Sequence, residues 1–174
     1  MKYNDINIKE CTIYKWILYL LNNPNYISYS YKTRLHNLLV FSNLIYYKKY
    51  SKDALSINIK ISNKGFFIDN LDSVLIKMEK AELVGVRYGI YGAHIIPLTS
   101  LDKEAYTEEE LFILDIINNS INRLSDSLLE NYAIGNVAWS KDKINSVINL
   151  SDINIGEFIE FIKKTEEHPI LNRR

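Results

Sequence analysis

The sequence predicts an α+β fold, mainly a helical bundle with a small antiparallel sheet or hairpin at its side. Three observations support this class. Apolar residues recur at helical spacing behind capping residues, one segment alternates apolar and polar residues, and two short apolar runs flank a glycine-bounded turn. Apolar residues make up 47% of the 174 positions and charged residues 24%, which is the composition of a folded globular protein.

Two helices are predicted in the first 50 residues. Asn7 and Glu10 form a capping-box pattern, and the apolar spacing behind them predicts a helix over residues 8–22. A second helix is predicted over residues 30–50, with Ser30 as its cap. This second helix is long and apolar, so we expect it to lie at the centre of the core. The residues expected to be buried are Trp16, Leu38, Leu39, Ile117, Ile121 and Trp139.

The middle of the chain predicts the β-structure. Residues 55–61 alternate between apolar and polar, which predicts a half-buried strand, and residues 63–65 predict a turn. A short helix is predicted over residues 69–81, opened by an aspartate. Residues 83–98 predict a hairpin whose turn is Gly89-Ile90-Tyr91-Gly92. A strand, a short helix and a hairpin in this order resemble a winged-helix module.

The last third of the chain predicts further helices. Thr107 and Glu110 form a capping box that opens a helix over residues 107–124. Shorter helical pieces are predicted over residues 125–132 and 140–148. A final helix is predicted to begin at the Asn154 and Glu157 pattern, and we expect the tail 168–174 to be frayed.

Charge is distributed unevenly along a chain whose net charge is zero. Residues 1–100 hold 13 lysines and arginines against 7 acidic residues, with 11 of the 13 tyrosines, whereas residues 101–174 hold 8 against 14. A basic, tyrosine-rich half beside an acidic half is compatible with nucleic acid on one face, or with two halves that attract each other. We predict a single domain over residues 1–174, and nucleic acid is a possible but not a favoured partner.

The sequence argues against several classes of protein. The single cysteine, Cys11, excludes a disulfide framework and indicates a reducing cytoplasm. No apolar run reaches the ~20 residues of a membrane span. His36, His94 and His168 share no metal-ligand spacing, and there is no phosphate loop, dinucleotide fingerprint or nucleophile elbow. We therefore expect no catalytic residue, no metal and no cofactor.

Several motifs point to a family. The run Leu35-His36-Asn37-Leu38-Leu39-Val40-Phe41-Ser42 is similar to a hallmark Leu-x-Lys-Leu-Leu-Tyr-Phe-Ala helix, with Asn37 and Val40 in place of its Lys and Tyr. Lys64-Gly65-Phe66 stands where that family has a Gly-Pro. Thr107 to Leu111 and Ala138-Trp139 match its C-terminal helix start and closing Ala-Trp. In these motifs the chain resembles the Panacea-domain family, the SocA-like antitoxins of bacteria and prophages.

This resemblance implies a non-enzymatic protein-binding module of a microbial or phage conflict system. Such a module would be an antitoxin-like neutraliser that covers its partner's working site by direct protein–protein contact. One alternative is a small middle subunit of an ABC-ATPase-type defence complex. Another is a winged-helix DNA-binding regulator, which Asp69, Asp72 and Glu79 on the candidate recognition helix disfavour because carboxylates repel phosphates.

Exposed aromatic residues are the expected contacts with a protein partner. Phe66 and Phe67 follow a tight turn, while Tyr88 and Tyr91 lie on the hairpin, where side chains cannot all reach the core. Aromatic residues dominate the energetics of interfaces, but also of cores. The predicted partner-binding residues are therefore Phe66, Phe67, Tyr88 and Tyr91, with core or hairpin packing as the other interpretation.

Overall fold

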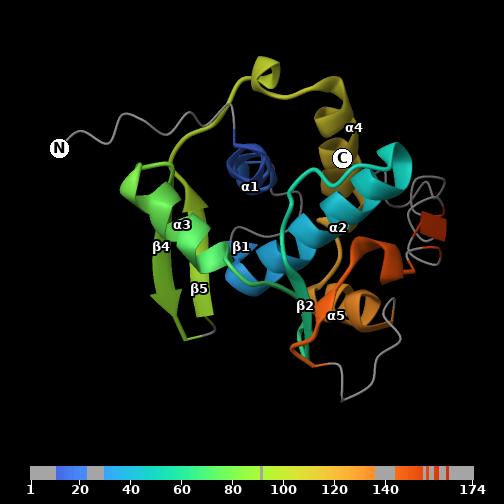
Figure 1. Cartoon of the computed structure of the whole chain (residues 1–174). Helices are drawn as coiled ribbons and strands as arrows, with labels where there is room; N and C mark the ends of the chain where they lie inside the picture. The colour runs from blue at the N-terminus through green and yellow to red at the C-terminus, as the bar shows by residue number, and fades with distance from the viewer. Residues whose placement is uncertain are drawn as a thin grey trace.

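The computed structural model describes residues 11–22, 30–90, 92–135, 144–154, 156, 159–160 and 164. Within these ranges the fold is α+β, as predicted. Helices surround one apolar core, and two small antiparallel sheets lie against them (Figure 1). The helices are α1 (Thr12–Asn22), α2 (Lys32–Tyr50), α3 (Leu71–Lys80), α4 (Glu108–Ile116) and α5 (Asp126–Gly135). The strands are β1 (Ser30–Tyr31), β2 (Ile59–Ser62), β3 (Gly65–Ile68), β4 (Val84–Gly89), β5 (Gly92–Pro97) and β6 (Val147–Ile148).

Helix α2 runs through the middle of the molecule (Figure 1). Every residue from Arg34 to Tyr46 is buried, so this helix is covered on all sides by the rest of the fold. The central position predicted for the second helix is confirmed. Buried positions were also predicted correctly for Trp16, Leu38, Leu39, Ile117 and Ile121, while Trp139 lies outside the described residues.

The two sheets are built differently from the sequence expectation. The hairpin β4–β5 is completed by β1, in the order β1-β5-β4, and the other sheet has the order β3-β2-β6. The predicted strand 55–61 therefore does not join the hairpin. It also begins only at Ile59, because the Asp53 carboxylate accepts hydrogen bonds from the N–H groups of Leu55 and Ser56 and holds that stretch as a turn.

Three strands were not predicted. β1 contains Ser30, which was expected to cap the second helix, and Tyr31 is the N-cap instead. β3 follows the turn directly and pairs with β2 from Ile59↔Ile68 to Ser62↔Gly65. β6 falls within residues 140–148, where a helical piece was expected, and pairs with Ile59 and Lys60 instead. The N–H of Asn145 just before β6 donates to the Ile61 carbonyl (3.0 Å), so backbone pairing to β2 replaces helical bonding here.

The strand predicted for the winged-helix-like segment, residues 55–61, lies in the other sheet, and β1 takes its place beside the hairpin. Helix α1, strand β1, helices α2 and α3, and the hairpin β4–β5 follow one another, with the β2–β3 hairpin inserted between α2 and α3. Helix α3 lies across the face of the β4–β5 hairpin (Figure 1).

Helix α4 begins at the predicted capping box. The Thr107 hydroxyl accepts from the N–H of Glu110, and the Glu110 carboxylate accepts from the N–H of Thr107. The helix does not continue to residue 124 as a regular α-helix, because Ile117–Ile121 forms a π-helical turn at its end. The last predicted helix lies largely outside the described residues.

Candidate functional site

A groove of about 290 Å³ lies between α3 and the β4–β5 hairpin. Apolar side chains of both strands form its floor, and two carboxylates of α3 and one lysine of α2 stand at its sides. Its lining residues are Lys32, Asp72, Leu75, Ile76, Glu79, Val86, Tyr88, Ala93 and Ile95. The groove therefore exposes polar and apolar surface in about equal parts, and it lies where a helix crosses a strand pair.

The sequence of α3 divides its surface into three sides. Leu71, Leu75 and Met78 are buried and fix the helix to the core. Asp72, Ile76 and Glu79 recur at i, i+4 and i+7, so they share the side that borders the groove. The exposed residues Ser73, Lys77 and Lys80 lie on another side, away from the groove lining. The acidic and basic residues of this candidate recognition helix are thus separated.

The hairpin carries large apolar side chains out into solvent. Val84 is fully buried, but two alternate positions further along the same strand Tyr88 is 86% exposed, and Ile90 at the turn is 96% exposed. On α3, Ile76 is 52% exposed. The outer half of the hairpin therefore projects beyond the core, and Tyr88 is not a core residue.

Charges at the groove are held in defined positions. Lys32 Nζ lies 2.9 Å from Asp72 Oδ1, which links α2 to α3 at one end of the groove. Glu79 Oε1 accepts a hydrogen bond from the backbone N–H of Val86 (3.2 Å). Within the part of the chain that is described, no lysine, arginine or histidine lies within ion-pair distance of Glu79. This end of the groove is accordingly acidic.

Phe67 is a second exposed aromatic residue, next to α2. Its side chain is 37% exposed, and its ring stacks on His36 with centroids 4.8 Å apart. His36 is buried and accepts the N–H of Ile68 at Nδ1 (3.0 Å). Burial lowers the pKa of His36 to about 4, so the imidazole is neutral at pH 7. Lys32, which lines the groove, and His36, which stacks on Phe67, are one turn apart on α2.

Phe66 is not at the surface. It is 2% exposed and packs edge-on against Phe41, with ring centroids 5.3 Å apart. Strand β3 alternates, so Phe66 and Ile68 face the core while Phe67 faces outward. The expectation of an exposed Phe66 is therefore wrong. Phe67 and Tyr88 are exposed as expected, and Tyr91 lies outside the described residues.

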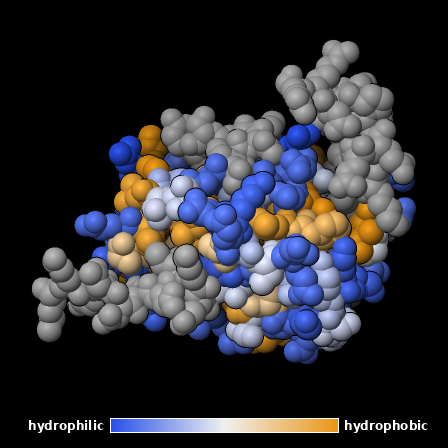
Figure 2. Space-filling model, turned by 90° about the horizontal axis from the view of Figure 1, so that it is seen from above, coloured by the Kyte–Doolittle hydropathy of each residue, from blue (hydrophilic) through white to orange (hydrophobic). Residues whose placement is uncertain are grey.

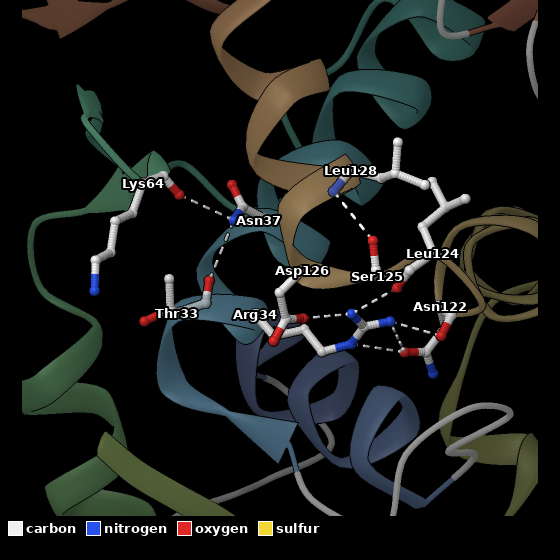
Figure 3. Close-up of polar contacts among 9 residues, drawn as sticks. All are labelled: Thr33, Arg34, Asn37, Lys64, Asn122, Leu124, Ser125, Asp126 and Leu128. Carbon is white, nitrogen blue, oxygen red and sulfur yellow. Dashed lines mark hydrogen bonds and ion pairs between the residues drawn. The ribbon is translucent and has the colours of Figure 1, made fainter. Parts of the chain in front are cut away.

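Asn37 joins α2 to β3 and to the turn before it, and Figure 3 shows its bonds to Thr33 and Lys64. Its Oδ1 accepts the N–H of Phe66 (2.9 Å), and its Nδ2 donates to the carbonyls of Thr33 and Lys64 (both 3.4 Å). Gly65 has φ +94°, and a Cβ there would lie 2.6 Å from Asn37 Oδ1 and 3.0 Å from the Ala133 Cβ. This position of the resembled hallmark motif thus serves packing in the present fold.

Arg34 is a buried arginine whose donors are all directed at protein acceptors (Figure 3). Its side chain is 3% exposed, and its guanidinium donates to the backbone oxygens of Asn122 (2.6 Å) and Leu124 (2.9 Å). It also pairs with Asp126 Oδ1 (2.6 Å). Since these bonds satisfy the carbonyls that follow the π-helical turn, Arg34 joins α2 to the start of α5 and has a structural role.

A second buried ion pair ties α1 to the capping box. Lys15 Nζ lies 2.7 Å from Glu110 Oε2, and Trp16 Nε1 donates to Glu110 Oε1 (3.2 Å). Sequence reasoning missed both buried cations. The capping-box pattern predicted that Glu110 caps α4. It could not predict the ion pair of Glu110 with Lys15, because the two residues are 95 positions apart in the sequence.

Two other depressions are more polar than the groove. One of about 520 Å³ lies beside β2 and β6, with Tyr47 and Asp53 at its margin. The other, of about 440 Å³, lies between α1 and α4 and holds Tyr19, whose hydroxyl donates to Asp115. Among the described residues, no three His, Cys, Asp or Glu side chains are grouped as a metal site requires.

Comparison with known proteins finds no matching family model, and no curated protein or solved structure matches the chain. The resemblance to Panacea-domain antitoxins remains a prediction from the motifs.

In the described part of the chain, every helix is too short or too polar to cross a bilayer. Seen from above, hydrophobic areas are separated by hydrophilic ones (Figure 2).

Proposed function

We propose that this chain is a non-enzymatic protein-binding module that acts by covering a partner's working site, as an antitoxin-like neutraliser in a microbial or phage conflict system. Its contact surface is the groove together with the exposed side chains of Ile76, Tyr88 and Ile90, called here the groove surface. The supporting observation is the exposure of Ile76 and Tyr88 on the lining of one groove, with Ile90 exposed at the turn of the same hairpin. Apolar groups gathered in this way are stabilised when a second protein surface removes them from water.

The energetics of such a contact depend on a few anchors. A large aromatic side chain buried at the centre of an interface contributes more binding free energy than the contacts around it. Tyr88 has the apolar area and the hydroxyl for this role and is almost fully exposed in the free chain. A stable complex buries ~1,200–2,000 Å² in total, so we expect the contact to extend beyond the groove, with Phe67 as a further exposed aromatic residue.

Protein is favoured over nucleic acid by the charges at this site. A duplex touching both α3 and the hairpin would meet Asp72 and Glu79, which border the groove, and the apolar side chains of the groove surface. Carboxylates repel phosphates and apolar side chains do not bind them. Two lysines of the basic half of the chain are also engaged in contacts within the fold: Lys60 pairs with Asp69 (2.8 Å), and Lys49 Nζ lies 3.3 Å from the Phe112 ring centroid.

A winged-helix DNA-binding regulator is the second candidate. The winged-helix-like element order and the exposed Ser73, Lys77 and Lys80 side of α3 favour it. Gel shifts with duplex DNA at physiological salt distinguish the two functions. We expect weak binding without sequence preference, whereas discrimination of about 10³-fold over random sequence would favour the regulator.

The proposed function is tested by co-purification of the tagged chain from its native host, with identification of the protein that stays bound at moderate salt. That protein is then expressed with and without this chain. We expect it to arrest growth alone and to be neutralised by the wild-type chain, but not by a Tyr88→Ala, Ile90→Ala double variant. Leu128→Ala on α5, an exposed leucine outside the groove lining, is the matched control and should neutralise normally.

If cells that express the captured protein grow equally well with and without this chain, the proposed neutraliser function is wrong. A captured ATPase complex would instead support the alternative of a middle subunit. We place the action of the module in the cytoplasm, which is supported by the free, half-buried Cys11.

A further inference from the structure

We propose that the partner binds by β-augmentation: an extended segment of the partner adds as a strand to the outer edge of β4, with a basic residue of that segment facing Glu79. This inference rests on the proposed function and specifies the chemistry of its contact. Main-chain hydrogen bonds would supply affinity, and alternate side chains over the groove would supply specificity.

The register of the hairpin shows which backbone groups face outward. β4 is the end strand of the order β1-β5-β4 and is the outermost strand in Figure 1. The pair Gly89↔Gly92 closes a two-residue loop, so the hydrogen-bonded pairs fall at Gly85, Arg87 and Gly89. Val84, Val86 and Tyr88 then direct their N–H and C=O groups away from β5. Pro97, which has no N–H, lies opposite Val84 and agrees with this register.

One outward group already bonds a side chain. The N–H of Val86 donates to Glu79 Oε1, which stands where the carbonyl oxygen of a further strand would stand. The backbone N–H and C=O of Tyr88 have no hydrogen-bond partner among the described residues. Among the described residues, no strand therefore pairs with the outer edge of β4 from Val86 to the turn. The N–H of Val86 is bonded only to the exposed Glu79 carboxylate, which an added strand would displace.

The side chains around this edge favour an apolar and basic segment. An added strand would place alternate residues on the α3 side of the sheet, beside Val86, Tyr88 and Ile76. Asp72 already has Lys32 as its partner, but in the described part of the chain no cation lies within ion-pair distance of Glu79. A lysine or arginine in the segment would pair with Glu79 when its carboxylate leaves the Val86 N–H.

A second copy of this chain fits the edge less well. Antiparallel pairing of two β4 strands about Val86 would bring two Glu79 carboxylates together, which is unfavourable for like charges. Glu79 thus protects the edge from self-association while attracting a basic partner. The occupant is accordingly a basic, extended segment of another protein.

The test is titration of the full chain, followed by amide NMR, with a capped octapeptide that alternates valine and lysine. We expect the amide signals of Val86 and Tyr88 to move. A matched peptide with glutamate in place of lysine should bind at least about tenfold more weakly, and Glu79→Gln should remove that difference. Lack of binding, or shifts confined to another surface, would overturn the proposal.

Backbone pairing is tested separately from side-chain contact. Tyr88→Pro removes an outward N–H without removing a bond to β5, and we expect it to weaken peptide binding about tenfold or more relative to Tyr88→Thr, which keeps the N–H. An alternately N-methylated octapeptide checks the same bonds on the wild-type chain, so the test holds even if the proline variant fails to fold. Equal binding by the methylated peptide would contradict augmentation.

The captured partner separates the two proposals. If Tyr88→Ala releases it while Tyr88→Pro and Tyr88→Thr behave alike, the groove surface is the contact but the edge is not. If none of these variants changes partner binding, the proposed function fails as well. A concentration-dependent dimer of the wild-type chain that Tyr88→Pro abolishes would replace the partner segment with a second copy.

Discussion

The carboxylate of Glu79 on α3 accepts the backbone N–H of Val86 on β4, with 3.2 Å between Oε1 and N. This contact joins the helix and the hairpin at the margin of the groove. It also places a negative charge at a free strand edge, next to a tyrosine that is almost entirely exposed. The same residue thus stabilises the free chain and determines the charge of the surface that a partner meets.

Leu38→Ala should destabilise the fold by about 2–5 kcal/mol. Leu38 is buried in the fully covered segment of α2, so the substitution leaves a cavity that the surrounding helices cannot fill. Urea unfolding followed by circular dichroism measures the change. A loss near zero would contradict the central position of α2.

Gly65→Ala should destabilise the chain by more than about 1 kcal/mol. The left-handed φ of +94° strains any side chain there, and the new Cβ would collide with Asn37 Oδ1. Gly135→Ala is the matched control, because nothing lies within 4 Å of its Cβ position. Equal free energies of unfolding for the two variants would show that the Asn37 junction is not tightly packed.

Arg34→Met should cost about 3–5 kcal/mol of stability, because it removes the hydrogen bonds that the buried guanidinium donates to the carbonyls of Asn122 and Leu124. Asp126→Asn should cost less, since the Asp126 side chain is 42% exposed and water replaces its charge–charge contact. Denaturant melts of both variants give the comparison. The reverse order would mean that the ion pair, and not the carbonyl contacts, stabilises this junction.

Acid should destabilise the protein partly through His36. Its pKa is lowered to about 4 in the folded chain, mainly by burial and also by nearby Lys32, whereas the unfolded side chain titrates near 6.5. Between these values the unfolded state binds more protons, so stability decreases as pH falls from about 6.5 to about 4, by about 3 kcal/mol in total. Asp72 nearby acts in the opposite direction.

The pH effect is measured by urea unfolding at a series of pH values, for the wild type and for His36→Gln, which keeps an acceptor for the Ile68 N–H. The variant should lose this part of the pH dependence. Identical slopes in the two proteins would show that another group is responsible.

Local signals in the sequence were sufficient for much of the fold. The Thr107–Glu110 capping box and the glycine-bounded hairpin depend on residues within a few positions of one another, and both formed as predicted. The pairing of β6 with β2 joins segments almost 90 positions apart. A strand of two residues is too short to show an alternation of apolar and polar residues, so the sequence could not predict this pairing and a helical piece was expected there.

The candidate site was predictable only in part. The exposure of Tyr88 was expected from its place on the hairpin, with core packing as the other interpretation. Phe66 and Phe67 were not distinguished, because the face that each occupies depends on the register of the unpredicted strand β3. The contact of Glu79 with the hairpin could not be predicted either. In the sequence its negative charge only disfavoured DNA binding, because its hydrogen bond to the Val86 N–H depends on how α3 packs on the hairpin.

The affinity of the captured partner for Tyr88→Ala tests the central claim most directly. We expect this variant to lose at least about 2 kcal/mol of binding free energy in isothermal titration, while its thermal melt matches that of the wild type. The Leu128→Ala control should bind normally. Unchanged binding by Tyr88→Ala, or a loss of stability as large as the loss of binding, would contradict the claim that the groove surface is where this protein meets its partner.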